Sequence, residues 1–151
     1  MIEQNLILIL VMLPFLGAIA AATLPVDARN AAAWISGLVL AAGLVILAAL
    51  WGQVSEGRVL TAFVRWVPSL RLNLVFRIDA FSWFFVGLVL AIGVLVIVYA
   101  RYYLSKSDPV PRFYSFLMAF TGAMVGMLAS GNILMLVVFW ELTSIMSFLL
   151  I

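Results

Sequence analysis

One acidic residue, Glu141, lies in the middle of an apolar stretch that runs from Asn132 to Ile151. If this stretch is a helix that begins at Asn132, a rise of about 1.5 Å per residue places Glu141 roughly 14 Å from its start, near the middle of a hydrocarbon core roughly 30 Å thick. Inserting a charged side chain there costs on the order of 2.5–3.5 kcal/mol, so such a group pairs, takes up a proton or faces a hydrated cavity. We therefore expect Glu141 to translocate protons.

Three hydroxyl residues share part of the helix surface with Glu141. At about 100° per residue, Thr143, Ser144 and Ser147 fall with Glu141 in one arc of about 160°. This pattern predicts a polar face that supports the carboxylate and turns toward other helices. The alternative is a structural carboxylate that only holds neighbouring helices together.

The composition is that of a membrane protein. Hydrophobic residues make up 68% of the chain and charged residues 9%, whereas soluble domains are about 45–50% apolar. The chain has no Cys and no His, which removes the usual ligands for zinc, haem and iron–sulfur clusters, so we expect no metal and no cofactor. Its net charge of +2 comes from residues between the apolar stretches, where they contact lipid headgroups rather than nucleic acid.

The apolar stretches predict an all-α polytopic membrane protein with about five transmembrane helices in a single domain, residues 1–151. The expected spans are residues 5–24, 31–51, 79–103, 113–129 and 132–151. The last span reaches Ile151 without a basic flank or polar tail, so we expect the chain to be the N-terminal part of a longer subunit. Ala18-Ile19-Ala20 resembles a signal-peptide cleavage site, but Glu3 stands where such peptides carry Lys or Arg, which favours a retained span.

The segment between the second and third spans, residues 58–77, is of a different kind. In its second half polar and apolar residues mostly alternate: Arg71, Leu72, Asn73, Leu74, Phe76, Arg77. A period of two indicates strands, so we predict a surface β-hairpin, with an irregular loop as the alternative.

Asp79 directly precedes the apolar run from Ala80 to Tyr103. Asp is among the preferred N-cap residues, and we expect it to cap this helix. The alternative is that Asp79 marks the place where protons enter the span.

Small residues recur on the fourth predicted span, where Gly122 and Gly126 form a GxxxG step that Ser130 extends. Such a ridge is suited to close helix contact, although in so apolar a chain it arises easily by chance.

The positive charges do not separate the two sides of the membrane by number. Four arginines lie between the second and third spans, and four basic residues lie on the other side: Arg29, Arg101, Lys106, Arg112. Because short loops next to helix ends weigh most, we expect the second group to be cytoplasmic and the N-terminus to be outside.

The residues around Glu141 resemble a known family. The sequence FWELTSIMSFLLI, residues 139–151, is similar to the fifth transmembrane helix of the A subunit of Mrp-type monovalent cation/proton antiporters. Upstream, residues 76–82 resemble that family's F-x-x-D-G-[LF]-S motif, with Ala80 where glycine is usual, and further resemblance lies in residues 112–114 and 124–132.

This resemblance implies a subunit of a multi-subunit Na⁺ or other monovalent cation/proton antiporter in a bacterial inner membrane, an ion transporter rather than an enzyme. The partners it implies are the other antiporter subunits, the lipid bilayer, protons and monovalent cations. In the family the matching glutamate couples to a lysine on the seventh helix, which this chain lacks.

The F-W-E core is shared with antiporter-like subunits of respiratory complex I and of membrane-bound hydrogenases. The alternative function is therefore a membrane arm of a redox-driven proton pump. The residues that follow Glu141, Leu142 to Ile145, favour the antiporter.

Overall fold

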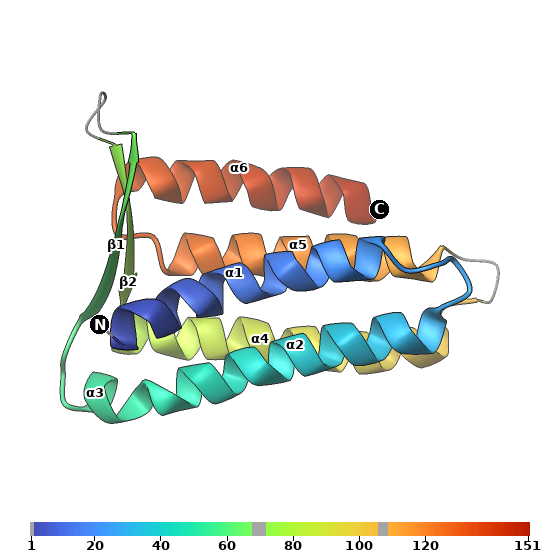
Figure 1. The fold of residues 1–151 in the computed structure, drawn as a ribbon, viewed down its shortest axis with the longest axis horizontal. Helices are drawn as coiled ribbons and strands as arrows, with labels where there is room; N and C mark the ends of the chain where they lie inside the picture. The colour runs from blue at the N-terminus through green and yellow to red at the C-terminus, as the bar shows by residue number, and fades with distance from the viewer. Residues whose placement is uncertain (1, 68–71, 106–108) are drawn as a thin grey trace.

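Five long helices lie side by side and a β-hairpin crosses one end of them in the computed structural model, which describes residues 2–67, 72–105 and 109–151 (Figure 1). Arg71 and Lys106, which entered the predictions of the hairpin and of the orientation, lie outside the described residues. The elements are α1 (Ile2–Ala22), α2 (Arg29–Ala49), α3 (Trp51–Ser55), β1 (Leu60–Val67), β2 (Leu72–Ile78), α4 (Ala80–Tyr103), α5 (Val110–Leu128) and α6 (Ile133–Leu150).

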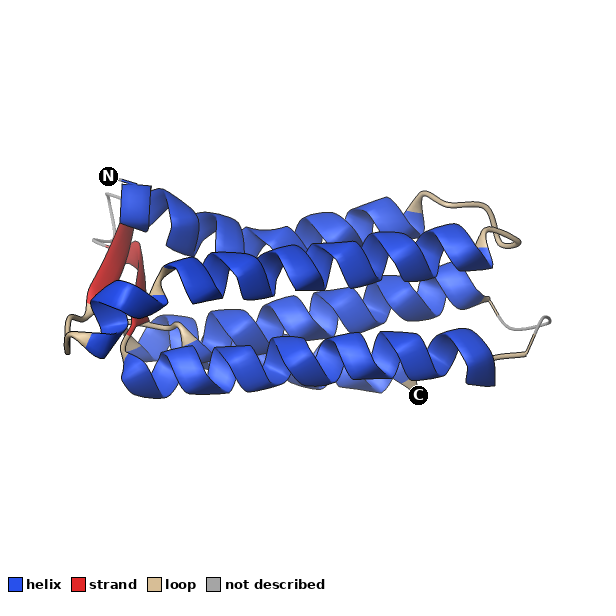
Figure 2. Cartoon of the chain, turned by 90° about the horizontal axis from the view of Figure 1, so that it is seen from below, coloured by secondary structure: helices blue, strands red, loops and turns tan. Residues whose placement is uncertain are grey.

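The two strands confirm the predicted hairpin over an irregular loop. They pair antiparallel, with Leu60 opposite Ile78 and Ala62 opposite Phe76, and the register shifts between Arg65 and Val67. These two facing pairs are buried, whereas Phe63 and Arg77 are exposed. The hairpin therefore lays an apolar face over the ends of the helices, at the same end as the N-terminus (Figures 1 and 2).

The helix α5 is the centre of the bundle, in contact with α1, α2, α4 and α6. Within the described residues, α1, α2, α4 and α6 are each long and apolar enough to cross a membrane, which agrees with a multi-pass membrane protein. Those four do not include α5, which the sequence also predicts to span, because its first turns carry Arg112, Tyr114 and Ser115. A helix enclosed by other helices does not need the fully apolar surface that a lipid-facing helix needs.

The glycine step on α5 is a contact site for two different neighbours. A Cβ at Gly122 would lie 3.0 Å from the ring of Phe15 on α1, and a Cβ at Gly126 would fall onto the ring of Phe139 on α6. The absence of side chains at these two positions therefore lets aromatic rings from both sides approach the α5 backbone.

Candidate functional site

Glu141 lies halfway along α6, on the side of the helix that faces away from α5. The residues that turn toward α5 are spaced at three and four positions and are apolar: Met135, Phe139, Leu142, Met146. The side chain of Glu141 is exposed, and within the described residues it forms no hydrogen bond or ion pair. The helices of this chain thus fix the position of the carboxylate but do not cover it.

The predicted supporting hydroxyls divide into two kinds. Thr143 Oγ1 donates to the carbonyl oxygen of Trp140 at 2.6 Å, and Ser144 Oγ donates to the same oxygen at 3.3 Å. These bonds are local to the helix, so neither hydroxyl proton points at Glu141. Ser144 and Ser147 are exposed with Glu141, whereas Thr143 is half-buried. The polar face that the sequence predicts is therefore uncovered within the described residues and does not turn toward α1–α5.

The start of α6 is fixed by its own cap and by the hairpin. Asn132 is the N-cap residue, and its Oδ1 accepts from the amide of Met135 at 2.9 Å. Its Nδ2 donates to the carbonyl oxygen of Asn73 on β2 at 3.2 Å, and the amide of Val75 donates to Met135 Sδ at 2.9 Å. Both ends of this short network are held by backbone, so β2 sets where the Glu141 helix begins.

The turn before α6 continues the strand pairing. The amide of Arg77 donates to the carbonyl oxygen of Ala129, and the amide of Gly131 donates to the carbonyl oxygen of Val75, both at 2.7 Å. Between them, Phe76 pairs with Ser130 in an antiparallel bridge. A Cβ at Gly131 would lie 2.7 Å from the carbonyl oxygen of Val75, so this approach requires glycine.

Asp79 is the N-cap of α4. Its Oδ1 accepts from the amide of Ser82 at 2.8 Å, and its Oδ2 accepts from the Arg77 guanidinium at 2.5 Å. The hydrogen bond from Arg77 and that from the Ser82 amide hold the pKa of the Asp79 carboxyl below its usual value of 3.8. A carboxylate that stays ionised through the neutral range suits a cap better than a group that exchanges protons.

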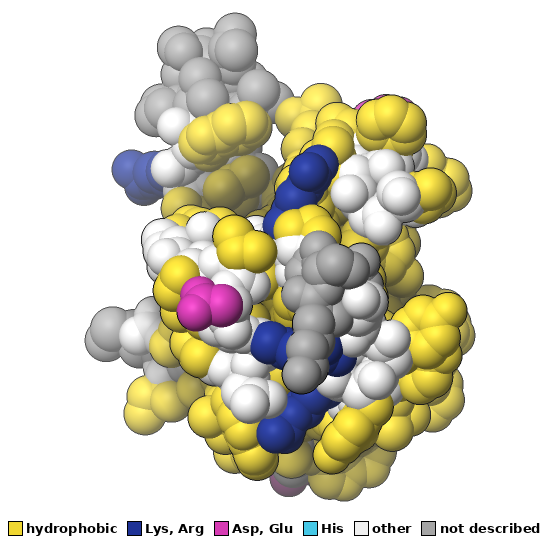
Figure 3. Space-filling model, turned by 90° about the vertical axis from the view of Figure 1, so that its right-hand side faces the viewer, with side chains coloured by type: hydrophobic (Ala, Val, Ile, Leu, Met, Phe, Trp, Pro, Cys, Tyr) yellow, Lys and Arg dark blue, Asp and Glu magenta, His cyan; other side chains and the backbone are white. Residues whose placement is uncertain are grey.

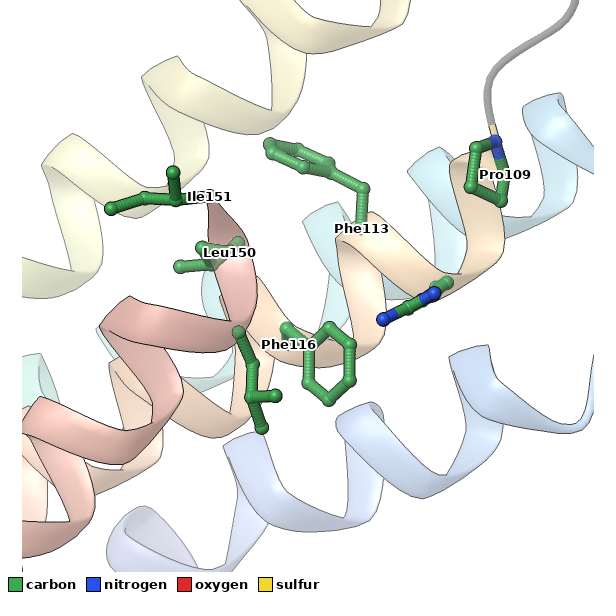
Figure 4. Close-up of a pocket in the computed structure, with 7 residues that line it drawn as sticks. Pro109, Phe113, Phe116, Leu150 and Ile151 are labelled. Carbon is green, nitrogen blue, oxygen red and sulfur yellow. The ribbon is translucent and has the colours of Figure 1, made fainter.

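A pocket of about 260 Å³ lies at the other end of α6, nine residues beyond Glu141. Figure 4 shows Phe113 and Phe116 of α5 on one side of it and Leu150 and Ile151 at the end of α6 on the other. Arg112 contributes the charge of this pocket, which does not include Glu141. Within the described residues, no three His, Cys, Asp or Glu side chains gather in a metal-binding group.

The contacts of Asn132 and Met135 with β2 were missed by the sequence analysis, which interpreted residues 130–132 only as a tight turn. The partners Asn73 and Val75 lie about 60 positions away along the chain. The only signal was an N-cap residue, Asn132, directly before an apolar run.

Comparisons with known proteins agree with this arrangement. Residues 64–114 match a family model described as the N-terminus of chain 5 of NADH-ubiquinone oxidoreductase (complex I). The chain is 46% identical over 148 residues, 98% of its length, to the A/B subunit of a probable K(+)/H(+) antiporter of Rhizobium meliloti (strain 1021), of which it covers 15%. It is also 46% identical over 98 residues, 64% of its length, to the A subunit of the Na(+)/H(+) antiporter of Alkalihalophilus pseudofirmus, of which it covers 12%.

Two solved structures share the fold. The Mrp complex from Dietzia sp. DQ12-45-1b matches with a TM-score of 0.77 and 25% identity, over 95% of this chain and 15% of the other chain. The membrane-bound sulfane sulfur reductase, an archaeal respiratory membrane complex, matches with a TM-score of 0.78 and 17% identity, over 93% of this chain and 22% of the other chain.

Helix arrangement, hairpin and matches together define the class: the chain is homologous to part of the antiporter-like membrane subunits. Within that class, its relatives at 46% identity are antiporter A subunits, and the resemblance to the A subunit of Mrp-type antiporters is confirmed. The chain spans about a seventh of the length of the first of these relatives.

Proposed function

We propose that this chain is the N-terminal part of a proton-translocating subunit in a multi-subunit monovalent cation/proton antiporter. In this proposal Glu141 takes up and releases the proton, with Ser144 and Ser147 beside it and Thr143 on the flank of the same face. Asp79 caps α4 and takes no part in transport. The relatives named as antiporter subunits support the proposal.

The observation that carries the proposal is the uncovered carboxylate at mid-helix. Glu141 is eight residues beyond the first residue of α6, or roughly 12 Å along its axis. Intramembrane acids are rare, face a bundle interior or a hydrated cavity, and mark ion pathways by default. Since α1–α5 leave Glu141 exposed, its partners come from helices outside this chain or from another subunit.

The chemistry follows from charge. A cationic side chain that approaches Glu141 stabilises the carboxylate anion, which releases its proton; when the cation moves away, desolvation favours the neutral acid, which binds a proton again. The resemblance supplies a lysine on the seventh helix of the family as the candidate cation. Repetition of this cycle moves protons while the complex moves a monovalent cation in the opposite direction.

We also propose the bacterial inner membrane and an outside N-terminus. The hairpin lies at the N-terminal end of the bundle, tied to α1 by a hydrogen bond from Gln4 Nε2 to the carbonyl oxygen of Phe63 at 2.9 Å. The opposite end carries the short loop between α1 and α2 with Arg29, and the ends of α4 and α5 with Arg101 and Arg112. Basic residues close to helix ends favour the cytoplasmic side.

The test is antiport by the complete complex in inverted membrane vesicles that hold a pH gradient reported by a quenched fluorescent amine. Both Na⁺ and K⁺ are added, because relatives named for each cation are equally similar. We expect a cation to dissipate the gradient in the native complex, and Glu141→Gln to abolish this response while the complex still assembles.

The matched control is Glu56→Gln, which makes the same chemical change at an exposed side chain between α3 and β1. It should leave antiport unchanged. Normal antiport by Glu141→Gln would remove Glu141 from the mechanism. Loss of assembly in parallel with activity would instead assign it a structural role.

A redox-driven pump arm is the second candidate, because the family model that matches residues 64–114 is drawn from complex I. It uses the same carboxylate but takes its energy from a partner oxidoreductase. If neither cation affects the gradient in native vesicles, while an electron donor generates a gradient that Glu141→Gln abolishes, this second function is correct.

A further inference from the structure

A groove of about 320 Å³ runs along the outside of the bundle between α2 and α4. On α2 it follows Trp34, Gly37 and Ala41, and on α4 it follows Val94, Val98 and Arg101. Each set spans seven residues on one helix face, so the groove extends about 10 Å inward from the basic end of the bundle. Its floor is open because Gly37 has no side chain and Ala41 has a small one.

The mouth of the groove is positively charged and aromatic. The guanidinium of Arg101 lies 5.4 Å from the ring centre of Trp34 on the facing helix and 5.9 Å from that of Tyr102. Within the described residues the ion pairs involve Arg58 and Arg77, so Arg101 has no carboxylate partner there. A second arginine is adjacent: Arg29 donates to the carbonyl oxygen of Arg101 from Nε at 3.1 Å and from Nη2 at 2.5 Å.

The surroundings are those of a lipid-facing surface at the depth of the headgroups. Large apolar side chains beside the groove, such as Leu38 and Leu95, are exposed, and Trp34 and Tyr102 are 58% and 78% exposed. Exposed Trp and Tyr are typical of the membrane–water interface. Figure 3, which looks onto this end of the bundle, shows basic side chains among the hydrophobic ones.

We propose that this groove binds an anionic phospholipid, with an acyl chain along Gly37, Ala41, Val94 and Val98 and the phosphate at Arg101. The charge decides the occupant. An unpaired guanidinium with a second arginine beside it complements a phosphate, and basic pockets between transmembrane helices bind anionic headgroups. An apolar helix of another subunit would leave Arg101 unpaired, and the groove is only about two helical turns long.

The experiment uses the full-length protein in its complete complex, reconstituted in vesicles of phosphatidylcholine and phosphatidylglycerol. A trace of phosphatidylglycerol with a photoreactive diazirine in one acyl chain is added, and the cross-linked peptides are identified by mass spectrometry. We expect adducts on residues 94–98 or 37–41. The same diazirine on phosphatidylcholine should label these residues about fivefold less, the ratio that roughly 1 kcal/mol per arginine gives.

Three variants separate the contributions. Arg101→Gln should lower labelling by phosphatidylglycerol about fivefold, whereas Arg101→Lys should retain most of it because the charge remains. Gly37→Leu should remove the acyl adducts by filling the floor; a Cβ at Gly37 would meet Ile97 only at an ordinary 3.9 Å, so the backbone tolerates the change. Arg112→Gln is the matched control, because it removes one charge at the same end of the bundle but outside this groove.

Three results would each overturn the proposal. Absence of adducts at both segments in the native complex would mean that protein covers the groove. Equal labelling by the two lipids would mean that the headgroup charge is not recognised. An equal loss in Arg112→Gln and Arg101→Gln would mean diffuse attraction of lipid to a basic surface rather than a site.

Discussion

Among the described acidic residues, Glu141 is the one that lies more than two helical turns from either end of its helix. The others sit at helix ends or in connections, where water or an arginine can stabilise their charge, as Arg77 does for Asp79. Position alone therefore separates the carboxylate suited to chemistry inside the membrane from those with local structural roles.

Asp79 carries a prediction that depends on pH. Removing an N-cap side chain costs about 1 kcal/mol, so Asp79→Ala should lower the thermal stability of the purified complex. Because the folded-state pKa of Asp79 lies below its usual value of 3.8, its stabilising effect is fully present above that value and is lost as the pH falls through the folded-state pKa. The measurement is the fraction of complex that survives heating, followed by size-exclusion chromatography.

The stability difference between native protein and Asp79→Ala should be largest near about pH 7 and shrink near about pH 3. Asp79→Asn, which keeps an acceptor for the Ser82 amide, should lie between the two. A difference that grows on acidification would contradict the ionised cap. A loss of antiport in Asp79→Asn out of proportion to its stability would restore the proton-uptake role.

At this scale the sequence predicts what depends on neighbours along the chain. An Asp directly before an apolar run predicts the cap on α4, and a lone Glu within such a run indicates a functional carboxylate. The contact between Asn132 and Asn73 is not predictable in this way. It depends on how the hairpin folds back onto a turn 59 residues away.

Among the secondary-structure elements, the hairpin does more than close one end of the bundle. Its strand β2 pairs with β1 on one edge and with residues 129–131 on the other. That second edge is joined directly to α6. The position of the Glu141 helix therefore depends on a surface element as well as on its packing against α5.

Gly131→Ala tests this connection. The added Cβ would lie 2.7 Å from a backbone oxygen of Val75, which cannot rotate away as a side chain can. We expect the strand and the turn to separate, at a cost of about 1–3 kcal/mol typical of overpacking. The thermal stability of the complex and its antiport rate should both fall.

Gly52→Ala is the matched control, since a Cβ at Gly52 would have no atom within 4 Å. It should match the native protein in both measurements. If Gly131→Ala also behaves as native, the pairing between β2 and residues 129–131 does not position α6.

The hairpin and the long helices could be predicted because their patterns are local: a period of two in residues 71–77 and apolar runs for the helices. The central place of α5 could not. Its own sequence is less apolar than that of its neighbours, and only its contacts with four other helices show that it is enclosed. Likewise, the glycine step predicted close contact but could not specify the two aromatic rings that occupy it.

For the whole molecule, the arrangement of the helices makes a prediction about the two sides of the membrane. Val59, beside the hairpin, and Val26, between α1 and α2, are both exposed and lie at opposite ends of the bundle. The chain contains no Cys, so a single cysteine at either position is a reporter without background from this segment. With the N-terminus outside, an impermeant maleimide should label Val59→Cys in intact cells and Val26→Cys only in inverted vesicles.

The reverse pattern would keep the fold and invert the orientation. Labelling of both positions from the same side would contradict the placement of the hairpin and of the α1–α2 connection at opposite ends of the bundle. The two results thus test the proposed orientation and the fold separately.

The packing of α1 against α5 has a consequence for how the protein is made. Ser115 Oγ on α5 donates to the carbonyl oxygen of Ala18 on α1 at 2.8 Å, and the two residues are 97 positions apart. At about 5–20 residues per second, the ribosome needs about 5–20 s to synthesise that distance. During this interval α1 can pair with α2, but the face around Gly17 that later receives Met118 is still in contact with lipid. The first helix to enter the membrane is therefore among the last to complete its packing.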